Sequence, residues 1–236
     1  MLHVVVPVYN EHENIGNTLN ALRDKVHSPH EVTVVYDFDE DSTIPAVRSW
    51  QAAHPGEPIF LLKNDLGRGV VFAIRKGLEA VKEGAALVVM ADMSDDLVVV
   101  DRMAELMEQG YDVVCGSRYM RGGRQIGGPW LKGMLSRLAG LSLHWLTRIP
   151  THDVSNSFKM YSAALLQSVR VESTGGFEIG LEILVKAFVS GRRITEVPSV
   201  WRDRTAGESR FRLWKWMPHY LKWYWVAVRW AWFGVR

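Results

Sequence analysis

The chain has 236 residues, enough for one large α/β domain, alone or with a short accessory segment. Hydrophobic residues make up 47% and charged residues 23%, a globular composition that excludes a disordered chain. The net charge of +2 gives no indication of nucleic-acid binding, and Cys115 is the only cysteine, which excludes an intramolecular disulfide.

The first half of the chain alternates short apolar runs with helical patterns. Leu2–Val8 is rich in β-branched residues and lacks the basic lead of a signal peptide, so we expect it to form a strand. The expected strands are Leu2–Val8, Glu31–Tyr36, Pro58–Lys63, Ala86–Met90 and Asp112–Gly116, separated by helices over about Glu13–His27, Ile44–His54, 70–82 and Val98–Gln109. This alternation predicts the α/β class: a mostly parallel, twisted sheet with helices on both faces.

The second half of the chain is less regular. The glycine-rich, basic stretch Arg121–Gly128 predicts a mobile loop, and Arg202–Arg212 predicts an exposed loop. We expect helices at Leu131–Thr147 and Glu178–Val189, and strands at Asp153–Tyr161 and Arg193–Val200. One α/β domain over residues 1–212 and a C-terminal segment over 213–236 are therefore expected.

Polar residues follow four of the five expected strands. They are Tyr9, Asn10 and Glu11 after the first, Asp37, Asp39 and Asp41 after the second, Asp92, Asp95 and Asp96 after the fourth, and Arg118 after the fifth. In open α/β sheets the ligand site lies outside the carboxyl ends of the strands. One polar loop is unremarkable, but four at the same edge predict a binding site.

The stretch M-A-D-M-S-D-D holds three carboxylates that suit a hard divalent cation. Mg²⁺ or Mn²⁺ bound by Asp92 and Asp95 would neutralise a departing diphosphate. The competing interpretation is an N-cap with an acidic first helical turn. Asp37 is placed to accept hydrogen bonds from a base or ribose, whereas Asp39 and Asp41 have an N-cap as the alternative. Gly67 and Gly69 suit either a close approach to a ligand or a simple turn.

Six motifs follow one another in a specific order along the chain. They are V-V-V-P-V-Y-N-E, V-V-Y-D-F-D-E-D-S-T, M-A-D-M-S-D-D, G-S-R-Y-M-R-G-G, D-V-S-N-S-F-K-M-Y and V-P-S-V-W-R-D-R-T-A-G-E-S-R. This order resembles the family 2 glycosyltransferases of GT-A fold, particularly the branch of dolichol-phosphate mannose synthases and polyprenyl-phosphate glycosyltransferases. The resemblance runs from Val4 to about Arg212 and covers nearly the whole chain short of the tail.

The resemblance implies a metal-dependent, inverting transfer of a sugar from a GDP- or UDP-sugar to a polyprenyl or dolichyl phosphate. It assigns the nucleotide-sugar to Pro7, Tyr9, Glu11, Asp37, Asp39 and Gly69, the metal to Asp92 and Asp95, catalysis to Asp92, Arg118 and Arg204, and the acceptor phosphate to Ser136, Arg137, Arg204 and Arg210. Arginine suits phosphate because its planar fork can bond two oxygens at once.

Two positions depart from the family pattern. Met90 stands where the first Asp of the D-x-D motif is usual, and Tyr36–Asp37 stands where two aspartates are usual. Asp95 or Asp96 is then the candidate replacement ligand, with Asp39 or Asp41 helping at the donor. Three alternatives stay open: another acceptor such as a lipid-linked saccharide, a catalytically silent nucleotide-sugar-binding protein, which Met90 suggests, and a nucleotidyltransferase. The last should carry a glycine-rich, basic early loop, and P-V-Y-N-E is neither.

An acceptor phosphate is already a nucleophile near neutral pH, so no Ser-His-Asp arrangement is expected. The eight histidines are scattered and predict no zinc site. We expect a structural role for His152, which precedes Asp153 in the sequence.

Six of the ten tryptophans lie in the last two dozen residues. The polar residues among them (Arg212, Lys215, His219, Lys222, Arg229 and Arg236) recur with helical spacing, and Pro218 is expected to begin or kink the helix. Met217–Val235 is long enough to cross a bilayer, but Lys222 and Arg229 would each cost roughly 2.5–3.5 kcal/mol at its centre.

We therefore expect an amphipathic helix that lies in the interface and attaches a cytoplasmic protein peripherally to the cytoplasmic face of a membrane. The alternative is that this helix packs on the catalytic domain or on a partner chain.

Overall fold

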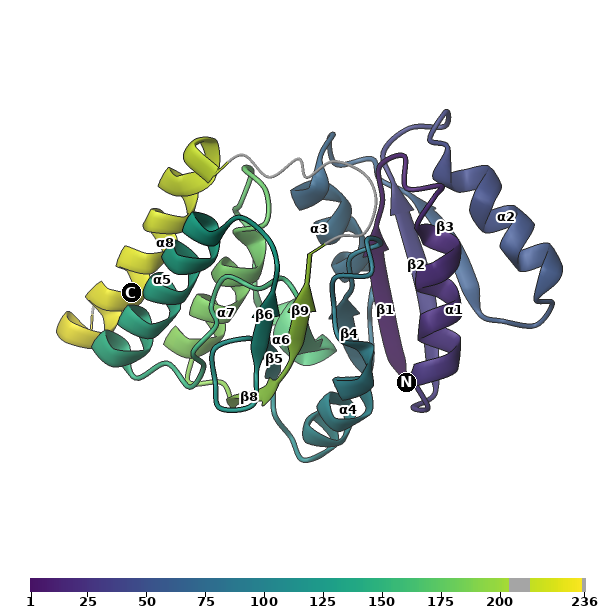
Figure 1. Ribbon diagram of the computed structural model, residues 1–236. Coiled ribbons are helices and arrows are strands. Elements are labelled where there is room, and N and C mark those ends of the chain that lie inside the picture. Colours follow the sequence, from purple (N-terminus) through teal and green to yellow (C-terminus); the bar gives the residue numbers. More distant parts are fainter. Residues whose placement is uncertain (204–212, 235–236) are drawn as a thin grey trace.

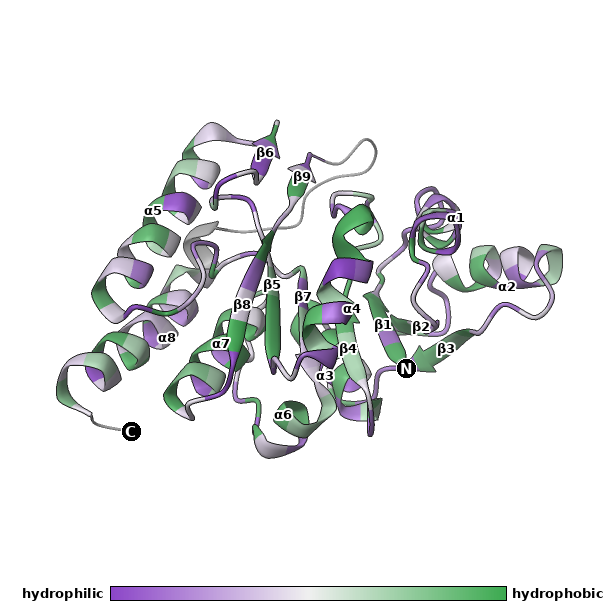
Figure 2. Ribbon diagram, turned by 90° about the horizontal axis from the view of Figure 1, so that it is seen from below, coloured by the Kyte–Doolittle hydropathy of each residue, from purple (hydrophilic) through white to green (hydrophobic). Residues whose placement is uncertain are grey.

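The computed structural model describes residues 1–203 and 213–234. Its centre is a seven-stranded sheet with the strand order β3-β2-β1-β4-β7-β5-β8 (Figures 1 and 2). The strands are β1 (Leu2–Pro7), β2 (His30–Tyr36), β3 (Ile59–Lys63), β4 (Ala85–Val88), β5 (Val113–Ser117), β7 (Lys159–Ser162) and β8 (Ile194–Pro198). Only β7 runs antiparallel to its neighbours, which confirms the mostly parallel sheet predicted from the sequence.

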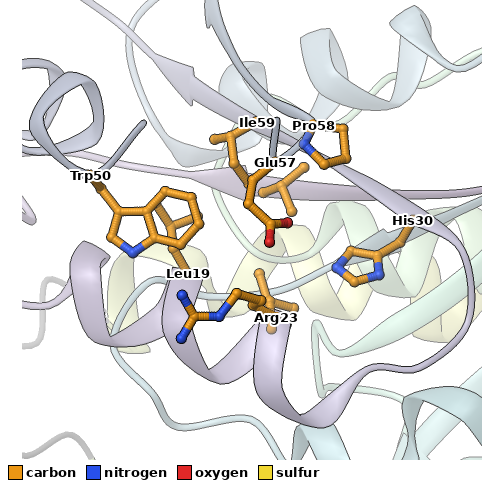
Figure 3. Close-up of a pocket in the computed structure, with 9 residues that line it drawn as sticks. Leu19, Arg23, His30, Trp50, Glu57, Pro58 and Ile59 are labelled. Carbon is orange, nitrogen blue, oxygen red and sulfur yellow. The ribbon is translucent and has the colours of Figure 1, made fainter. Parts of the chain in front are cut away.

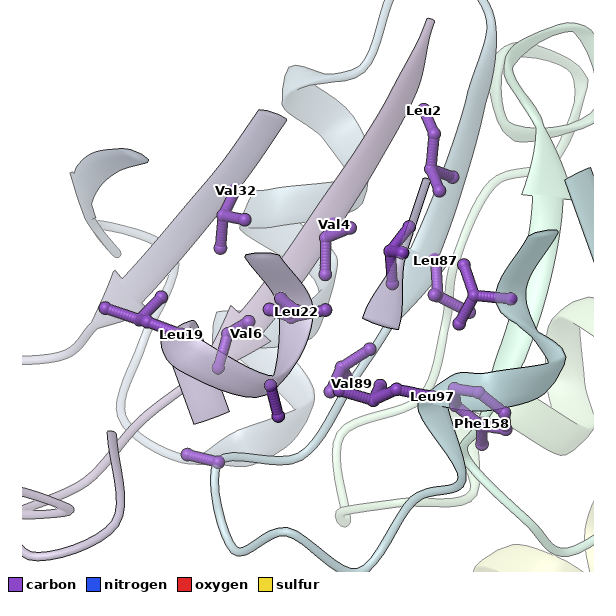
Figure 4. Packing of buried hydrophobic residues seen from close by; sticks show 14 of the residues in the cluster. Leu2, Val4, Val6, Leu19, Leu22, Val32, Leu87, Val89, Leu97 and Phe158 are labelled. Carbon is purple, nitrogen blue, oxygen red and sulfur yellow. The ribbon is translucent and has the colours of Figure 1, made fainter. Parts of the chain in front are cut away.

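Helices cover both faces of the sheet because successive strand residues point to opposite sides. They are α1 (Ile15–Lys25), α2 (Thr43–Ala53), α3 (Val70–Ala80), the 3₁₀ turn η1 (Leu97–Val99), α4 (Val100–Glu108), α5 (Trp130–Thr147), α6 (Ala163–Ser168), α7 (Ile179–Val189) and α8 (Leu213–Phe233). In β1, Val4 and Val6 pack with Leu22 of α1 in one core (Figure 4), whereas Val5 packs with Ile74 of α3 in the other.

Two segments differ from the sequence-based expectation. Instead of a mobile loop over residues 121–128, the chain forms β6 (Arg124–Ile126), which pairs in parallel with β9 (Val200–Arg202). The expected strand over Asp153–Tyr161 is also wrong for its first half, since β7 begins only at Lys159. There the Asp153 and Asn156 side chains bond backbone groups, which competes with strand pairing.

The C-terminal helix packs against the domain rather than standing apart from it. In two views α8 lies beside α5 and α7, at the end of the molecule far from β3 (Figures 1 and 2). Trp223 and Ala227 of α8 are buried. The face of the helix that carries them therefore packs on the domain, which was the alternative considered for the tail. The helix begins at Leu213, so Pro218 lies inside it and does not start it. None of the helices described is both long and apolar enough to cross a bilayer.

Candidate functional site

The loops that follow β1, β2, β4 and β5 meet at one edge of the sheet. The strands β1, β2 and β4 are mutually parallel, and β7 is antiparallel to both β4 and β5, so all four carboxyl ends face the same way. The loops that sequence analysis singled out therefore lie along one edge, as the fold predicts.

The first two loops are joined by hydrogen bonds. The Asn10 N–H donates to both carboxylate oxygens of Asp41, at 3.1 and 3.2 Å, and the Glu11 N–H donates to Thr43 Oγ1 at 2.9 Å. Asp41 is buried and also accepts from the Thr43 N–H, which supports the capping interpretation of this aspartate. These contacts fix the backbone after β1 relative to the backbone after β2.

Asp37 ties the end of β2 to the loop before α3. Its Oδ1 accepts from Asn64 Nδ2 at 2.7 Å, and its Oδ2 accepts from the Gly69 N–H at 2.7 Å. Gly69 has a φ of +119° at the N-terminus of α3, a conformation that side chains rarely adopt. Asp39 instead pairs with Lys63 at 2.5 Å on the exposed surface. Of the two aspartates assigned to the donor, only Asp37 organises the site backbone.

An aromatic cluster stands at the same end of the edge. The Tyr9 and Phe38 rings meet edge to face with centroids 5.3 Å apart, and the Arg68 guanidinium carbon lies 5.9 Å from the centre of the Phe38 ring. Pro7, the last residue of β1, is buried, so it shapes the turn but presents little surface. Of these three residues, only Tyr9 was assigned to the nucleoside from the sequence. Phe38 lies inside the motif V-V-Y-D-F-D-E-D-S-T but was not singled out, and no motif marks Arg68.

The three carboxylates after β4 have different surroundings. Asp96 accepts from the Val98 N–H at 3.3 Å and from the Val200 N–H at 3.2 Å, so it caps η1 and holds β9. Asp92 Oδ1 accepts from the Ser94 N–H at 3.1 Å, and Asp95 Oδ2 accepts from the Met90 N–H at 3.0 Å. The capping interpretation thus applies to Asp96 and leaves Asp92 and Asp95 as the acidic pair of this loop.

Asp95 has an unusual protonation equilibrium. Burial is the main reason why the pKa of its carboxyl is raised to about 7; the Met90 N–H opposes this rise, and the Asp92 carboxylate adds to it. A bound cation would relieve that repulsion, so the two carboxylates fit a divalent ion that takes one or two of them and completes its shell with water and diphosphate oxygens. Within residues 1–203 and 213–234, no three acidic, histidine or cysteine side chains gather at metal-binding distance.

Arg118 and Asp153 form the most highly connected ion pair of the site. Arg118 Nε donates to Asp153 Oδ2 at 2.6 Å, Nη2 donates to Oδ1 at 2.9 Å, and the Arg118 backbone N–H donates to Oδ2 at 3.0 Å. Burial disfavours both charges, but their attraction outweighs it, so the pKa of Arg118 is raised and that of Asp153 is lowered. The guanidinium is therefore held charged and in one orientation.

Hydroxyl groups surround the same guanidinium. Arg118 Nη2 donates to Ser136 Oγ and to Ser155 Oγ, both at 3.0 Å, and those two oxygens lie 2.5 Å apart. The Tyr119 hydroxyl donates to Ser136 Oγ at 2.9 Å, and its ring lies 4.8 Å from the Arg118 guanidinium carbon. Arg118 Nη1 donates no hydrogen bond to any of the described residues. We call Arg118, Tyr119, Ser136, Asp153 and Ser155 the arginine cluster.

The arginine cluster stands within electrostatic reach of the acidic pair. Arg118 lowers the pKa of Asp95, and Asp95 raises that of Arg118, although neither is the largest influence on the other. A positive centre and two carboxylates therefore share the edge between β4 and β5. This arrangement suits a reaction between two phosphate-bearing groups, because the charges at the edge can stabilise charge that develops as a bond between the groups forms or breaks.

The other residues predicted to bind the acceptor phosphate lie in different surroundings or outside the described residues. Ser136 belongs to the arginine cluster, whereas Arg137 is exposed on α5 yet close enough to lower the pKa of Tyr119, a group whose pKa burial raises overall. Arg204 and Arg210 lie outside the described residues. His152 Nδ1 lies 2.5 Å from Glu196 Oε1 and its ring stacks on His144, in line with the expected structural role.

Two buried acids near this edge, Asp153 and Glu178, were not singled out from the sequence. The role of Asp153 was hidden because its partner Arg118 is 35 positions away. Glu178 immediately precedes α7 and is fully buried; its Oε1 accepts from the Gly175 N–H at 2.7 Å, and its Oε2 has no hydrogen-bond partner within the described part of the chain. Burial and then Glu178 raise the pKa of Tyr220 on α8, so this acid lies close to the C-terminal helix. The motif D-V-S-N-S-F-K was a signal for the first acid, and no motif marked the second.

A shallow pocket elsewhere is not part of this edge. It is lined by Leu19, Arg23, His30, Trp50, Glu57, Pro58 and Ile59, among others (Figure 3). His30 and Ile59 are the first residues of β2 and β3, so the pocket lies at the amino ends of the strands. It therefore stands apart from the residues discussed above.

The fold is shared with solved structures. The chain matches glucosyl-3-phosphoglycerate synthase from Mycobacterium tuberculosis in complex with Mn²⁺, UDP and glucosyl-3-phosphoglycerate, with a TM-score of 0.71 and 15% identity over 100% of this chain and 81% of that one. A complex of the same protein with Mg²⁺ and UDP matches with a TM-score of 0.65 and 16% identity, over 89% of this chain and 72% of that one. The present fold is GT-A-like.

Sequence relatives are more specific. The undecaprenyl-phosphate mannosyltransferase of Micrococcus luteus is 30% identical over 87% of this chain and 85% of its own length. The polyprenol monophosphomannose synthase of Mycolicibacterium smegmatis is 24% identical over 88% and 79%. The dolichol-phosphate mannosyltransferase of Pyrococcus furiosus is 24% identical over 89% of this chain, which spans 58% of that longer protein. The family model Glycosyl transferase family 2 matches residues 3–170, and the chain belongs to this family.

Proposed function

We propose that this glycosyltransferase moves a hexose from a nucleotide-sugar to the phosphate of a polyprenyl phosphate, with inversion at the anomeric carbon, at the cytoplasmic face of a membrane. The arginine cluster carries the proposal. A charged guanidinium clamped by Asp153 and flanked by the Ser136 and Ser155 hydroxyls suits an acceptor phosphate, and it stands beside the acidic pair Asp92 and Asp95. The relatives named for polyprenyl-phosphate acceptors support the same acceptor class.

In the proposed reaction, an oxygen of the acceptor phosphate attacks the anomeric carbon. The new carbon–oxygen bond forms as the bond to the nucleoside diphosphate breaks, and the electron pair leaves with the diphosphate. The acceptor needs positioning rather than a strong base, because its phosphate already carries negative charge. Arg118 would offer its Nη1 edge to that phosphate, since Nε and Nη2 are engaged by Asp153 and the two serines.

The acidic pair would act on the donor side. A divalent cation held there would neutralise charge on the departing diphosphate. The side chain of Asp95 turns back to the backbone of Met90, and this places a carboxylate beside the position where the family usually has its first aspartate. This contact supports Asp95 as the substitute ligand and favours an active enzyme over a silent nucleotide-sugar-binding protein.

On the donor side, Asp37 fixes Gly69 and Asn64 next to the Tyr9–Phe38 ring pair. We infer that this corner receives the nucleoside, since aromatic faces suit a base. The sugar would then lie between the acidic pair and the arginine cluster.

The experiment is a turnover screen. The protein is incubated with GDP- and UDP-hexoses, with Mn²⁺ or EDTA, and with polyprenyl phosphate added or withheld. The proposal expects one donor to release its nucleoside diphosphate with Mn²⁺ and lipid phosphate present, and to give a lipid-linked sugar. Nucleotide-sugar binding without turnover under every condition would identify a silent binding protein instead.

A further inference from the structure

Most of the large hydrophobic side chains that are exposed in the described residues lie on α5 and α8. Of the sixteen large hydrophobic side chains exposed in the described residues, ten lie on these two helices, which makes this one surface rather than scattered residues. On α5 they are Trp130, Leu131, Met134, Leu138, Trp145 and Leu146; on α8 they are Leu221, Trp225, Trp232 and Phe233. Trp145 is 81% exposed and Trp130 is 76% exposed, more than any of the four exposed hydrophobic residues of α8.

The two helices join along a seam. The Tyr224 hydroxyl of α8 donates to Ser142 Oγ of α5 at 2.9 Å, and Trp232 Nε1 donates to the Leu146 carbonyl at 3.0 Å. Trp232 and Leu146 are themselves exposed, so the apolar stripe of one helix continues into that of the other. Figures 1 and 2 show α5 and α8 adjacent at the end of the molecule far from β3.

The charged residues of the two helices are all basic, and one of them, Lys222, pairs with Glu172 outside the helices at 3.4 Å. Neither α5 nor α8 contains Asp or Glu. Arg137 on α5, Arg148 just beyond its end, and Lys222 and Arg229 on α8 are exposed. A second copy of this chain seated on the surface would bring arginines together without a carboxylate between them. An anionic lipid surface supplies the complementary charge, and exposed tryptophans suit the boundary between head groups and acyl chains.

From these observations we propose that α5, together with α8, forms a two-helix surface that docks on an anionic lipid bilayer, and that α5 contributes the larger share. The attachment expected from the sequence involved the C-terminal helix alone. The proposal adds α5, a helix inside the catalytic domain. It rests on the proposed function in one respect only, which is the identity of the acceptor as a lipid phosphate.

The structure of α5 links this surface to the site. Its inner face carries Ser136 of the arginine cluster, the buried Leu143, and Gly140, where an added Cβ would meet the His152 carbonyl oxygen. Leu138 and Trp145 lie on the opposite side, given 3.6 residues per turn. Docking through that side would hold the arginine cluster about one helix diameter, ~10 Å, from the lipid surface.

The test is vesicle co-sedimentation without donor or acceptor, so that its result is independent of sugar transfer. The vesicles are phosphatidylcholine with or without phosphatidylserine. We expect the α5 variant W130S/W145S to bind phosphatidylserine vesicles about tenfold more weakly than wild type, and the α8 variant W225S to bind them more weakly as well. The control F60S removes an exposed aromatic side chain from β3, on the far edge, and should bind like wild type.

A second set of variants, Arg148→Glu and Arg229→Glu, tests the role of charge. They should abolish the preference of the protein for vesicles with phosphatidylserine over vesicles of phosphatidylcholine alone. Thermal unfolding of every variant checks that the fold is kept. Unchanged binding of W130S/W145S, with weaker binding of W225S, would overturn the role of α5. If no variant affected vesicle binding but W130S/W145S dissociated a dimer in solution, the surface would be an interface between copies and the proposal would be wrong.

Discussion

Arg118 and Asp153 share three hydrogen bonds of 2.6 to 3.0 Å, two from the guanidinium and one from the Arg118 backbone N–H, with the carboxylate fully buried. This pair decides which part of Arg118 remains available for a substrate. It also joins the end of β5 to the loop before β7, two elements that no local pattern in the sequence connects.

The first prediction concerns the stability of this pair. Asp153→Asn would leave a buried guanidinium without its countercharge, and removing one partner of a buried ion pair costs about 3–5 kcal/mol. Urea unfolding should show the midpoint falling sharply. The matched control is Glu105→Gln, which removes one partner of the exposed pair with Arg102 and should leave the midpoint unchanged. A wild-type midpoint for Asp153→Asn would show that the pair is dispensable to the fold.

The same pair predicts a pH dependence of stability. Burial acts to raise the pKa of Asp153, but Arg118 prevails, so the folded-state pKa lies below the ordinary value of 3.8. A depressed carboxyl pKa stabilises the fold above the unfolded-state value, and this contribution is lost as the pH falls through the folded-state value. The free-energy difference between wild type and Asp153→Asn should therefore be constant near neutrality and shrink below about pH 4. If the free-energy difference instead grew as the pH fell, the pKa of Asp153 would be raised in the folded state, and the lowered pKa assigned to it would be wrong.

The next prediction separates Ser136 from the rest of α5. Ser136→Ala removes a hydroxyl that the proposed acceptor phosphate would meet, so the KM for polyprenyl phosphate should rise about tenfold, equivalent to one hydrogen bond to a charged group. Ser142→Ala is the control on the same helix, because its hydroxyl bonds Tyr224 on α8 instead. Equal KM values for the two variants would remove Ser136 from the acceptor site.

The acidic loop gives a prediction about metal dependence. Asp92→Asn and Asp95→Asn should each weaken Mn²⁺ binding in the presence of nucleoside diphosphate, measured by electron paramagnetic resonance. Asp96→Asn should retain Mn²⁺ binding and lose thermal stability, because Asp96 accepts from the Val98 and Val200 N–H groups. If all three variants bound Mn²⁺ like wild type, the cation would have to lie elsewhere.

A further prediction distinguishes two aspartates of the loop after β2. Asp37→Asn loses an acceptor for the Gly69 N–H, so the loop before α3 loosens and the Kd for nucleoside diphosphate rises, roughly tenfold for one lost hydrogen bond to a charged group. Asp39→Asn affects only the exposed pair with Lys63, so its nucleotide Kd should stay at the wild-type value. Calorimetry compares the two, and a larger effect for Asp39→Asn would invert the assignment.

Much of the fold followed from local pattern, because apolar runs such as Leu2–Val8 are bounded by turns and separated by helical periodicity. The strand ends also located Asp37, Asp92 and Arg118 on one edge. The β6–β9 pair could not be predicted this way, since Arg124 and Val200 pair across a long stretch of chain and each strand has only three residues. Asp153 was missed for the same physical reason.

The C-terminal helix illustrates a second limit. Its aromatic and basic spacing predicted an amphipathic helix, but not which face is covered. Trp223 packs into the core beneath Lys186, whereas Trp225 is exposed. Removing the helix would therefore uncover the core, so surface substitutions such as W225S test the lipid contact better than a truncation does.

The central claim is that the acceptor is a phosphate held by the arginine cluster. The most direct measurement compares polyprenyl phosphate with the corresponding polyprenol, which has the same chain and lacks the phosphate, as acceptors for the donor found in the turnover screen. The account predicts a lipid-linked sugar with polyprenyl phosphate and none with polyprenol, and strongly reduced transfer in Arg118→Gln. Equal transfer to both lipids by the wild-type protein would contradict it.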